Sequence, residues 1–486
     1  MKLALQKKTK IVATISDKRC DVAFLQQLYE TGMNVVRINT AHQTPETSLG
    51  IIENVRKIST KIGILIDTKG PEIRITEMKN DQAVAVVTGD RVKMSGNPEV
   101  ASGPEMLCTN YEDFVKEVPV GAFILIDDGD VQLQVVEKHD DYLLCEAKND
   151  GKLKGRKTVN VPNVHMNLPP LTRRDVRFIH WAMDNGIDFI AHSFVRTKDD
   201  VLAVQKILDK RKSKIKIIAK IENRQGVENI DEILEHAYGI MVARGDLGVE
   251  VEMEELPGLQ RMLIEKCLAR EKPVIIATQM LHSMIEHPRP TRAEVTDVAN
   301  AIYQRTDAIM LSGETAGGKY PIESVRTMSK IAIQIEKDLP PAKERVRHEV
   351  RSGRLASTLA KSAVQVSREL PIRAFITDSY SGRLPRYLSA FRSKIPVFSL
   401  CYHDNIVREL SLSYGLFCYP ALPFKSNDEF SRYAIRLLRD QNCIDSEDIV
   451  AVIATSHNAQ NATTYLEVGV AQDMINEINQ EAYHKN

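Results

Sequence analysis

Polar and charged side chains stand at the ends of several buried, β-branched runs in the chain. They are Arg37, Asn39, Asp67, Ser193, Lys220, Glu222, Asp246, Thr278 and Glu314. If these side chains converge, the carboxylates could hold Mg²⁺ while the lysine and the arginine neutralise a phosphoryl group during its transfer. Two plainer interpretations stay open. Each residue could be polar because its strand leaves the core there, or the group could form a cluster of buried salt bridges.

A glycine-bearing loop with the sequence Ala-Arg-Gly-Asp-Leu-Gly, at residues 243–248, follows one of these runs. The free backbone N–H groups of Gly245 and Asp246 could bind a carboxylate or a phosphate. Glycines that serve only the turn are the alternative explanation. His42 follows another run and could be a ligand, although an ordinary surface histidine explains it equally well.

The elements that must position these residues alternate between short apolar runs and amphipathic stretches, which is typical of parallel strands connected by helices. Eight strands are expected, at residues 10–15, 34–39, 62–68, 188–193, 216–221, 239–243, 273–277 and 307–311. Helices are expected between them, for example at residues 21–30, 199–210, 256–270 and 291–303. Eight strand–helix units predict an α/β fold of the TIM-barrel type, whose active site lies at the carboxyl ends of the strands.

The connection from the third strand to the fourth is too long for one helix and its loops. Its sequence alternates with period two and has turn signals at residues 88–90, 127–130 and 149–151, which predicts a small all-β domain over the barrel mouth. Residues 340–351 resemble a charged linker, after which strands are expected near residues 374–377, 395–400 and 449–453. The expected domains are a barrel at 1–70 and 169–339, an inserted β domain at 71–168, and a C-terminal α/β domain at 340–486.

The composition argues against several classes of protein. The 486 residues include 65 Lys and Arg and 65 Asp and Glu, and this zero net charge argues against a general attraction to nucleic acid or anionic membranes. No apolar run is long enough to span a membrane and no signal-peptide core is present, which predicts a soluble, cytoplasmic protein. The seven scattered cysteines fit neither a disulfide framework nor a zinc site.

Several motifs together resemble those of the pyruvate kinase family. They are residues 66–74 (IDTKGPEIR), 218–223 (IAKIEN), 241–248 (MVARGDLG), 277–280 (ATQM), 288–294 (PRPTRAE) and 310–316 (MLSGETA). The resemblance runs in order from Thr9 to Lys330, through the inserted β domain, and continues more weakly to the C-terminus. It implies transfer of the phosphoryl group of phosphoenolpyruvate to ADP, which gives pyruvate and ATP in the last step of glycolysis.

The same resemblance implies the catalytic and substrate-binding roles. Lys220 would neutralise the phosphoryl group in transit and the developing enolate. Arg37 would contact the phosphate. The amides of Gly245 and Asp246, with Thr278, would bind the substrate carboxylate, and Thr278 would also help to deliver a proton to the enolate carbon through water.

Metal and nucleotide sites are implied as well. Glu222 and Asp246 would hold Mg²⁺ or Mn²⁺. Arg74, at the base of the inserted domain, would contact the phosphates of ADP or ATP. The other implied residues are Ser193, in the shell around the substrate, and Asn39 and His42, beside the nucleotide. The β domain would act as a lid that excludes water, because water competes with ADP as the phosphoryl acceptor.

The sequence departs from the family pattern at the site of a monovalent cation. Family members complete a K⁺ site with a serine hydroxyl at the position of Ala41. Asn39, Asp67 and the Thr68 carbonyl remain as ligands, and Glu72 matches the members that require K⁺. The expectation is that K⁺ still activates the enzyme, but with weaker affinity than a serine would give.

A phosphorylated effector could bind in the C-terminal domain, where one loop resembles the phosphate-binding loop of regulated family members. The residues are Thr377, Ser379, Ser381, Gly382 and Arg383. The start of an ordinary capped helix is the alternative explanation for this loop. A glycine-free segment at residues 454–462 replaces the family's later glycine-rich loop, so control by fructose bisphosphate does not follow from the resemblance.

Two other functions remain open at this stage. A barrel enzyme that performs enolate chemistry on pyruvate or oxaloacetate would also use Mg²⁺ and a lysine, but it would not need a lid with Arg74 at its base. A catalytically inactive regulator is disfavoured because the lysine, both metal-binding carboxylates and the threonine are present.

Residues 290–292 resemble subunit-contacting loops of a tetrameric family, which predicts a homotetramer. His192 and Glu252 depart from the family pattern, and no role follows for either.

Overall fold

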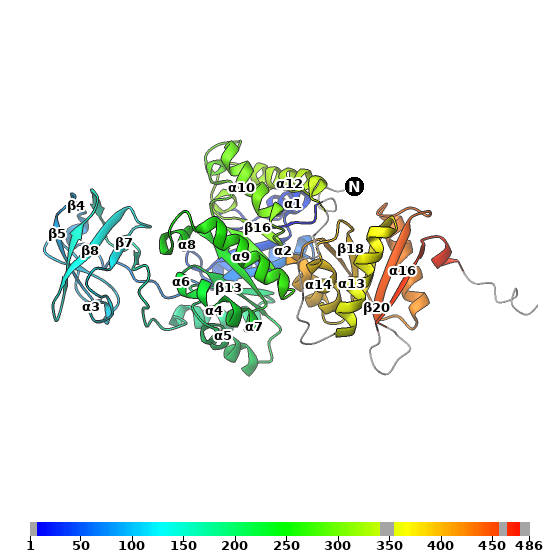
Figure 1. The fold of residues 1–486 in the computed structure, drawn as a ribbon, viewed down its shortest axis with the longest axis horizontal. Helices are drawn as coiled ribbons and strands as arrows, with labels where there is room; N and C mark the ends of the chain where they lie inside the picture. Colours follow the sequence, from blue (N-terminus) through cyan, green and yellow to red (C-terminus); the bar gives the residue numbers. More distant parts are fainter. Residues whose placement is uncertain (1–6, 341–353, 456–463, 477–486) are drawn as a thin grey trace, which may run out of the picture.

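The computed structural model describes residues 7–340, 354–455 and 464–476. The chain forms three bodies in a row (Figure 1). A barrel surrounded by helices lies in the middle, a body of β-sheet lies at one end, and an α/β body lies at the other. This arrangement confirms the predicted fold class of a TIM barrel with an inserted β domain and a C-terminal α/β domain.

Eight parallel strands close the central barrel. They are β1 (Lys10–Thr14), β2 (Val35–Asn39), β3 (Gly63–Asp67), β12 (Phe189–His192), β13 (Lys216–Ile221), β14 (Gly239–Ala243), β15 (Val274–Ala277) and β16 (Ala308–Leu311). Their order around the barrel follows the chain, and β16 pairs with β1 to close it. Each strand lies within one of the predicted runs, so the prediction of eight strands is confirmed.

The barrel strands are apolar on both faces because one face lines the barrel interior and the other is covered by helices. On β12, Phe189 and Ala191 belong to the interior cluster, while Ile190 packs into the outer core. Side chains alternate along a strand, so Ser193 continues the inward series and His192 the outward one.

Helices cover the outside of the barrel. They are α1 (Val22–Thr31), α2 (Pro45–Ile58), α4 (Arg173–Asp184), α5 (Lys198–Lys210), α6 (Arg224–Glu228), α7 (Ile230–His236), α8 (Arg244–Glu250), α9 (Leu256–Ala269), α10 (Arg292–Tyr303), α11 (Gly313–Ala316) and α12 (Pro321–Asp338). Local signals set their ends, since Asp21 caps α1 and Gly32 terminates it at a φ of +130°. Thr291 and Glu294 form a capping box on α10. Within the described ranges, none of the helices is long and apolar enough to cross a membrane.

The inserted body, which we call the lid, is formed by the part of the chain between the barrel strands β3 and β12. Its strands are β4 (Val84–Val86), β5 (Arg91–Ser95), β6 (Leu107–Cys108), β7 (Phe123–Ile126), β8 (Val131–Lys138), β9 (Leu143–Ala147), β10 (Gly151–Leu153) and β11 (Val159–Asn160), with one short helix, α3 (Phe114–Glu117). Six of these strands form one sheet, and β4 pairs with β10. The three predicted turns connect β4 to β5, β7 to β8 and β9 to β10. The lid has a hydrophobic core of its own.

The C-terminal body is a five-stranded sheet with helices. Its strands are β17 (Ile372–Ser379), β18 (Val397–Cys401), β19 (Leu416–Pro420), β20 (Ile449–Thr455) and β21 (Thr464–Val470), and its helices are α13 (Arg354–Glu369), α14 (Arg383–Ala390), α15 (Asp404–Glu409) and α16 (Asn427–Asp440). β19 and β21 are additional to the predicted strands, and β21 runs antiparallel to β20 at the sheet edge. All but the first residue of the expected linker at 340–351 lies outside the described residues.

This C-terminal body packs against the amino ends of the barrel strands. Leu412, in the short 3₁₀ helix that follows α15, belongs to the interior cluster and closes that end of the barrel. Arg408 pairs with Asp188 at 2.7 Å and Arg392 pairs with Asp307, and both carboxylates directly precede barrel strands. The lid lies at the opposite end (Figure 1), where the strands end in polar residues.

Candidate active site

Lys220, near the carboxyl end of β13, is the centre of a buried cluster of charges. Its Nζ lies 3.0 Å from Asp67 Oδ1, 2.8 Å from Glu222 Oε1 and 2.8 Å from Ser193 Oγ. Only 9% of the residue is exposed. Burial acts to lower the pKa of Lys220, but the carboxylates of Asp67 and Glu222 outweigh burial and raise it. The ammonium group therefore stays protonated.

Asp67, the last residue of β3, joins this lysine to a second cation. Arg37 on the neighbouring strand β2 donates from Nε to Asp67 Oδ2 at 2.7 Å, and its Nη2 forms an ion pair with the same oxygen at 2.7 Å. The same guanidinium donates to Thr14 Oγ1 at 3.0 Å. Burial acts to raise the pKa of Asp67, but Arg37 and Lys220 together lower it. One ionised carboxylate thus fixes two cations at the barrel mouth.

Glu222 and Asp246 are two further carboxylates beside the lysine. Glu222 Oε2 accepts the Phe194 N–H at 2.7 Å, whereas its buried Oε1 accepts no hydrogen bond from the described residues, although Lys220 Nζ is close. Burial raises the pKa of Glu222 to about 7, and nearby Asp246 adds to the rise. Burial also raises the pKa of Asp246, which lies in the first turn of α8. The pair therefore has an excess of negative charge, which a divalent cation would neutralise.

Glu222 and Asp246 fit a Mg²⁺ or Mn²⁺ ion. In the part of the chain that the structure describes, no group of three or more His, Cys, Asp or Glu is arranged to hold a metal. Mg²⁺ is usually bound by one or two carboxylates, while water and phosphate oxygens complete its octahedral shell. Two adjacent buried carboxylates whose pKa values are raised by burial match such a partial site, which a bound substrate would complete.

Thr278, directly after β15, is held against the glycine loop in an unusual backbone conformation. Its φ of +65° is rare for a β-branched residue. Its Oγ1 accepts the Gly245 N–H and donates to the Ala277 carbonyl, both at 2.7 Å. Arg244 donates to the Thr278 carbonyl at 2.8 Å and pairs with Asp297, which fixes the turn. Residues held in such conformations cluster at functional sites.

The oxygens expected to hold K⁺ lie on two adjacent strands, and they already accept hydrogen bonds. Asn39 Oδ1 accepts the Ala41 N–H at 3.1 Å. The Thr68 carbonyl accepts the Ser193 hydroxyl at 2.7 Å, and both Asp67 oxygens face the cations described above. A monovalent cation would share these oxygens with protein donors, and the Ala41 side chain offers it no further oxygen.

The residues predicted to bind the nucleotide lie at the rim of the site. Arg74, in the segment that enters the lid, donates to Glu72 Oε2 at 2.8 Å and to the Arg156 carbonyl at 2.7 Å. His42 is exposed in the turn after β2, and Asn39 is half-buried beside it. A ligand that joined these residues to the charge cluster would have to extend across the barrel mouth.

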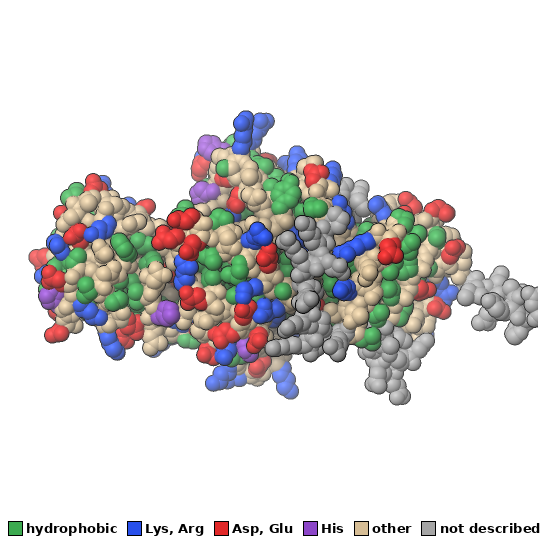
Figure 2. Space-filling view, in the orientation of Figure 1, with side chains coloured by type: hydrophobic (Ala, Val, Ile, Leu, Met, Phe, Trp, Pro, Cys, Tyr) green, Lys and Arg blue, Asp and Glu red, His purple; other side chains and the backbone are tan. Residues whose placement is uncertain are grey.

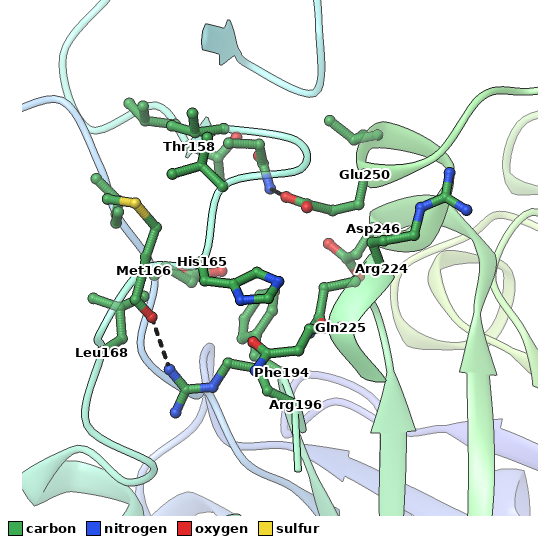
Figure 3. Close-up of a pocket in the computed structure, with 18 of the residues that line it drawn as sticks. Thr158, His165, Met166, Leu168, Phe194, Arg196, Arg224, Gln225, Asp246 and Glu250 are labelled. Carbon is green, nitrogen blue, oxygen red and sulfur yellow. Dashed lines mark hydrogen bonds between the residues drawn. The ribbon is translucent and has the colours of Figure 1, made fainter. Parts of the chain in front are cut away.

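A cleft separates the lid from this part of the barrel (Figure 3). Its lining includes Thr158, His165, Met166 and Leu168 from the lid side and Phe194, Arg196, Arg224, Gln225, Asp246 and Glu250 from the barrel side. Because Asp246 belongs to this lining, the cleft opens onto the carboxylate pair. The lid is thus placed to cover the site.

The sequence also suggested Glu314, a strand-end residue that does not join the cluster, and it did not suggest three residues that contact the site. Glu314 accepts two backbone N–H groups, from the loops after β15 and β16, and so it braces these loops. Thr14, Phe194 and Arg244 contact site residues directly. The sequence could have identified Thr14, which ends the first strand, and Arg244, which lies in the glycine loop. It could not have identified Phe194, which contacts Glu222 through its backbone N–H.

His192 lies behind the site on the outer face of β12. It is fully buried, and neither ring nitrogen has a hydrogen-bond partner among the described residues. Burial lowers the pKa of His192 to about 4, although Asp200 and Asp175, at the starts of α5 and α4, act to raise it. The imidazole is therefore uncharged at neutral pH.

The loop predicted to bind an effector is partly used within the protein. Ser379 Oγ accepts the Gly382 N–H at 2.7 Å, and Gly382 begins α14 with a φ of +73°. Thr377 is buried, whereas Ser381 and Arg383 are exposed. The serine bond thus fixes the turn before α14, whose N-cap Gly382 has no side-chain cap, and Ser381 and Arg383 remain exposed for a ligand. Most of the glycine-free segment at 454–462 lies outside the described residues.

Comparisons with known proteins agree over nearly the whole chain. A family profile described as pyruvate kinase, barrel domain matches residues 6–325, and one described as pyruvate kinase, alpha/beta domain matches residues 357–468. The chain is 44% identical to a pyruvate kinase of Borreliella burgdorferi, over 97% of this chain and 99% of that protein. It is 41% identical to one of Bacillus licheniformis, over 96% of this chain and 81% of that protein. A solved pyruvate kinase structure from Cryptosporidium parvum is similar, with a TM-score of 0.90 at 31% identity and coverage of 96% and 97%.

Proposed function

The chain belongs to the pyruvate kinase family of phosphotransferases, and we propose that the cluster around Lys220 is the site at which it transfers a phosphoryl group from phosphoenolpyruvate to ADP. The products are pyruvate and ATP, in the last step of glycolysis. The observation that supports the site most strongly is the lysine ammonium held between Asp67 and Glu222 at the lid end of the barrel. Phosphoryl transfer needs fixed positive charge, because negative charge spreads over the moving group and its neighbours.

Lys220 and Arg37 supply this fixed charge. Asp67 and Ser193 hold the lysine and Asp67 and Thr14 hold the arginine, so neither side chain has to reorganise during the reaction. Arg37 contacts the phosphate, and Lys220 stays close to the group in transit and to the enolate that it leaves behind. Both cations are preorganised because their partners lie on or directly after strands of the same closed barrel.

The glycine loop and Thr278 bind the substrate carboxylate. The Gly245 N–H donates to Thr278 Oγ1, and a bound carboxylate would replace that acceptor. The hydroxyl itself donates to the Ala277 carbonyl, so it would have to rotate away from that oxygen before it could relay a proton. After this rotation the hydroxyl is able to pass a proton, through water, to the enolate carbon. The left-handed conformation of Thr278 keeps the hydroxyl against the loop until the substrate arrives.

Glu222 and Asp246 are the proposed ligands of Mg²⁺ or Mn²⁺, and family members generally need a divalent ion and K⁺. When bound, the divalent ion supplies Lewis-acid stabilisation of negative charge on the substrate oxygens. The two carboxylates would be its protein ligands, and Asp246 also lines the cleft. For K⁺ we propose the oxygens of Asn39, Asp67 and Thr68, with weakened affinity because Ala41 provides no hydroxyl.

Arg74, Asn39 and His42 are the proposed contacts for the nucleotide. Arg74 stands where the chain enters the lid, so that it moves with the lid and meets phosphates in the cleft. The lid at residues 71–168 closes over the barrel at 1–70 and 169–339 and excludes water. A kinase needs a lid because water would compete with ADP for the phosphoryl group, whereas an enolate-forming lyase has no such need.

The remaining proposals concern the assembly and its control. We place the enzyme in the cytoplasm as a homotetramer with two-fold symmetry, from the resemblance of residues 290–292 to subunit-contacting loops. Sedimentation as a stable monomer at micromolar concentration would contradict this.

The C-terminal domain, residues 340–486, binds a phosphorylated effector through Ser381 and Arg383, with Thr377, Ser379 and Gly382 shaping the loop. A thermal-shift screen of sugar phosphates and nucleotides tests this, and no shift that depends on Ser381→Ala would end it.

A lactate-dehydrogenase-coupled assay tests the site. Pyruvate should form only with phosphoenolpyruvate, ADP and Mg²⁺ together, and K⁺ should increase the rate. Lys220→Met should abolish the activity, while the matched variant Lys206→Met, at an exposed lysine of α5, should not. Normal turnover of a folded Lys220→Met protein would refute the assignment of the site.

A further inference from the structure

Glu250, the last residue of α8, bonds to the lid across the cleft. Its Oε1 accepts a hydrogen bond from Asn160 Nδ2 of β11 at 2.8 Å. Both residues are half-buried, and burial raises the pKa of Glu250 while the bond to Asn160 opposes the rise. The two side chains are 90 positions apart in the chain and belong to different bodies. Figure 3 shows Glu250 and Asp246 on the same side of the cleft.

The position of Glu250 on α8 ties this bond to the proposed metal site. Asp246 and Glu250 are four residues apart on one helix, so they lie on the same face, one turn from each other. Both line the cleft together with Val249, which shows that this face is turned toward the lid. The Val251 N–H closes the last helical turn on the Leu247 carbonyl, so α8 moves as one unit.

A second contact between the lid side and the barrel has a different character. Arg196 Nη1 donates at 3.1 Å to the carbonyl of Met166, in the segment that returns from the lid to the barrel, and Asp200 holds the same arginine. This contact anchors the hinge through a backbone oxygen. The Asn160–Glu250 contact joins two side chains at the far edge of the cleft, so it breaks when the lid swings away and forms when the lid closes.

We propose that Asn160 and Glu250 form a latch that couples lid closure to the helix carrying the metal ligand Asp246. Both are positioning residues, because they act on the lid and on α8 and need not contact the substrate. This inference rests on the proposed role of Asp246. When the latch is closed, α8 is held with Asp246 facing the substrate cleft. When it is open, the half-buried carboxylate of Glu250 is hydrated.

Four variants test the latch: Asn160→Ala, Glu250→Ala, the double variant, and Glu250→Gln, which keeps an acceptor oxygen without the charge. The matched control is Glu252→Ala, at an exposed carboxylate two residues further along the chain. Acidic side chains gather near the junction of the lid and the barrel on the face that Figure 2 shows. Steady-state kinetics on the full chain gives kcat and the half-saturating concentrations of Mg²⁺ and ADP. Amide hydrogen exchange of residues 159–161 and 244–250 reports opening without any need for activity.

Each alanine variant should raise the half-saturating Mg²⁺ and ADP concentrations about 10-fold while kcat stays within about 2-fold, because saturating ligands still close the lid. The double variant should be no worse than the single ones, since one bond is lost in each case. Both segments should exchange faster in the alanine variants. Glu250→Gln and Glu252→Ala should resemble the parent protein.

Three results would overturn the latch. If Glu250→Gln is as impaired as Glu250→Ala, the charge matters rather than the hydrogen bond. If the two alanine effects add, or if exchange is unchanged, the residues are not coupled. Failure of the proposed metal site looks different, because Asp246→Ala would then leave the Mg²⁺ dependence unchanged while the latch variants still altered exchange.

Discussion

Lys220→Met removes the buried charge at the centre of the site while it keeps an unbranched, apolar side chain of similar length. For the chemistry, the loss of a preorganised cation aimed at the transferring group should lower kcat by about 10³-fold or more, which corresponds to about 4 kcal/mol. The side chain is 11% exposed, so water has little room to replace the ammonium group.

The structure also predicts a cost in stability. Lys220 neutralises Asp67 and Glu222, and removing one partner of a buried ion pair costs about 3–5 kcal/mol. Asp67 keeps the cation Arg37 as a partner, whereas Glu222 keeps the Phe194 N–H and its contact with Asp246 but no cation among the described residues, so the unpaired charge falls mainly on Glu222. The pKa of Glu222, already raised to about 7, should rise further until the group is protonated. Because protonation removes the unpaired charge, the expected loss in the free energy of unfolding lies at the lower end of that range, at about 3 kcal/mol.

Urea unfolding and the coupled assay measure the two effects separately. The double variant Lys220→Met/Glu222→Gln removes both partners of the pair, so it should regain most of the lost stability and remain inactive. Near-normal turnover in a folded Lys220→Met protein would refute the catalytic reasoning. A double variant that is no more stable than the single one would refute the reasoning about charge.

Three further predictions address the metals and the buried histidine. Glu222→Ala and Asp246→Ala should each raise the Mg²⁺ concentration needed for half-maximal rate by at least about 10-fold, because the ion loses one of its two protein ligands; unchanged Mg²⁺ titrations in both would exclude the pair. Ala41→Ser should strengthen K⁺ binding by about 1 kcal/mol, because the hydroxyl restores one contact. The measurement is the initial rate as a function of K⁺ concentration at constant ionic strength. Full activity without K⁺ would contradict this prediction. His192 has its pKa lowered from 6.5 to about 4, so the stability that it contributes is complete above pH 6.5 and is lost as the pH falls toward 4, by up to about 3 kcal/mol. His192→Gln, which does not titrate, should flatten the fall in urea-unfolding free energy over that range, and an unchanged slope would show that the histidine is not the cause.

The amino-acid sequence by itself determined the barrel. Strands of a parallel sheet are buried on both faces and therefore appear as short, continuous apolar runs, and all eight runs became strands. The inserted lid followed from period-two alternation and turn residues such as those at 127–130. In the C-terminal body, β19 was missed because it ends in Pro420, and β21 because it is an edge strand that contains Gly469.

The residues of the site were largely visible in the sequence as well, because parallel strands in a closed barrel bring their carboxyl ends together. Arg37, Asp67, Ser193, Lys220 and Glu222 make direct contacts, as convergence requires. What remained undetermined was the identity of each partner. A strand-end position does not tell whether a side chain turns into the mouth or braces a loop, and Glu314 braces a loop.

Only the tertiary structure decided the contacts between distant segments. Leu412 closes the amino end of the barrel, and Asn160 reaches Glu250 from the lid. Periodicity reports which face of an element is buried, but it carries no information on which distant element covers that face. Such contacts depend on the order of strands around the barrel and on how three bodies pack against one another. For the same reason, the sequence showed Lys220 as a candidate for catalysis, whereas the structure showed that its charge also stabilises two buried carboxylates.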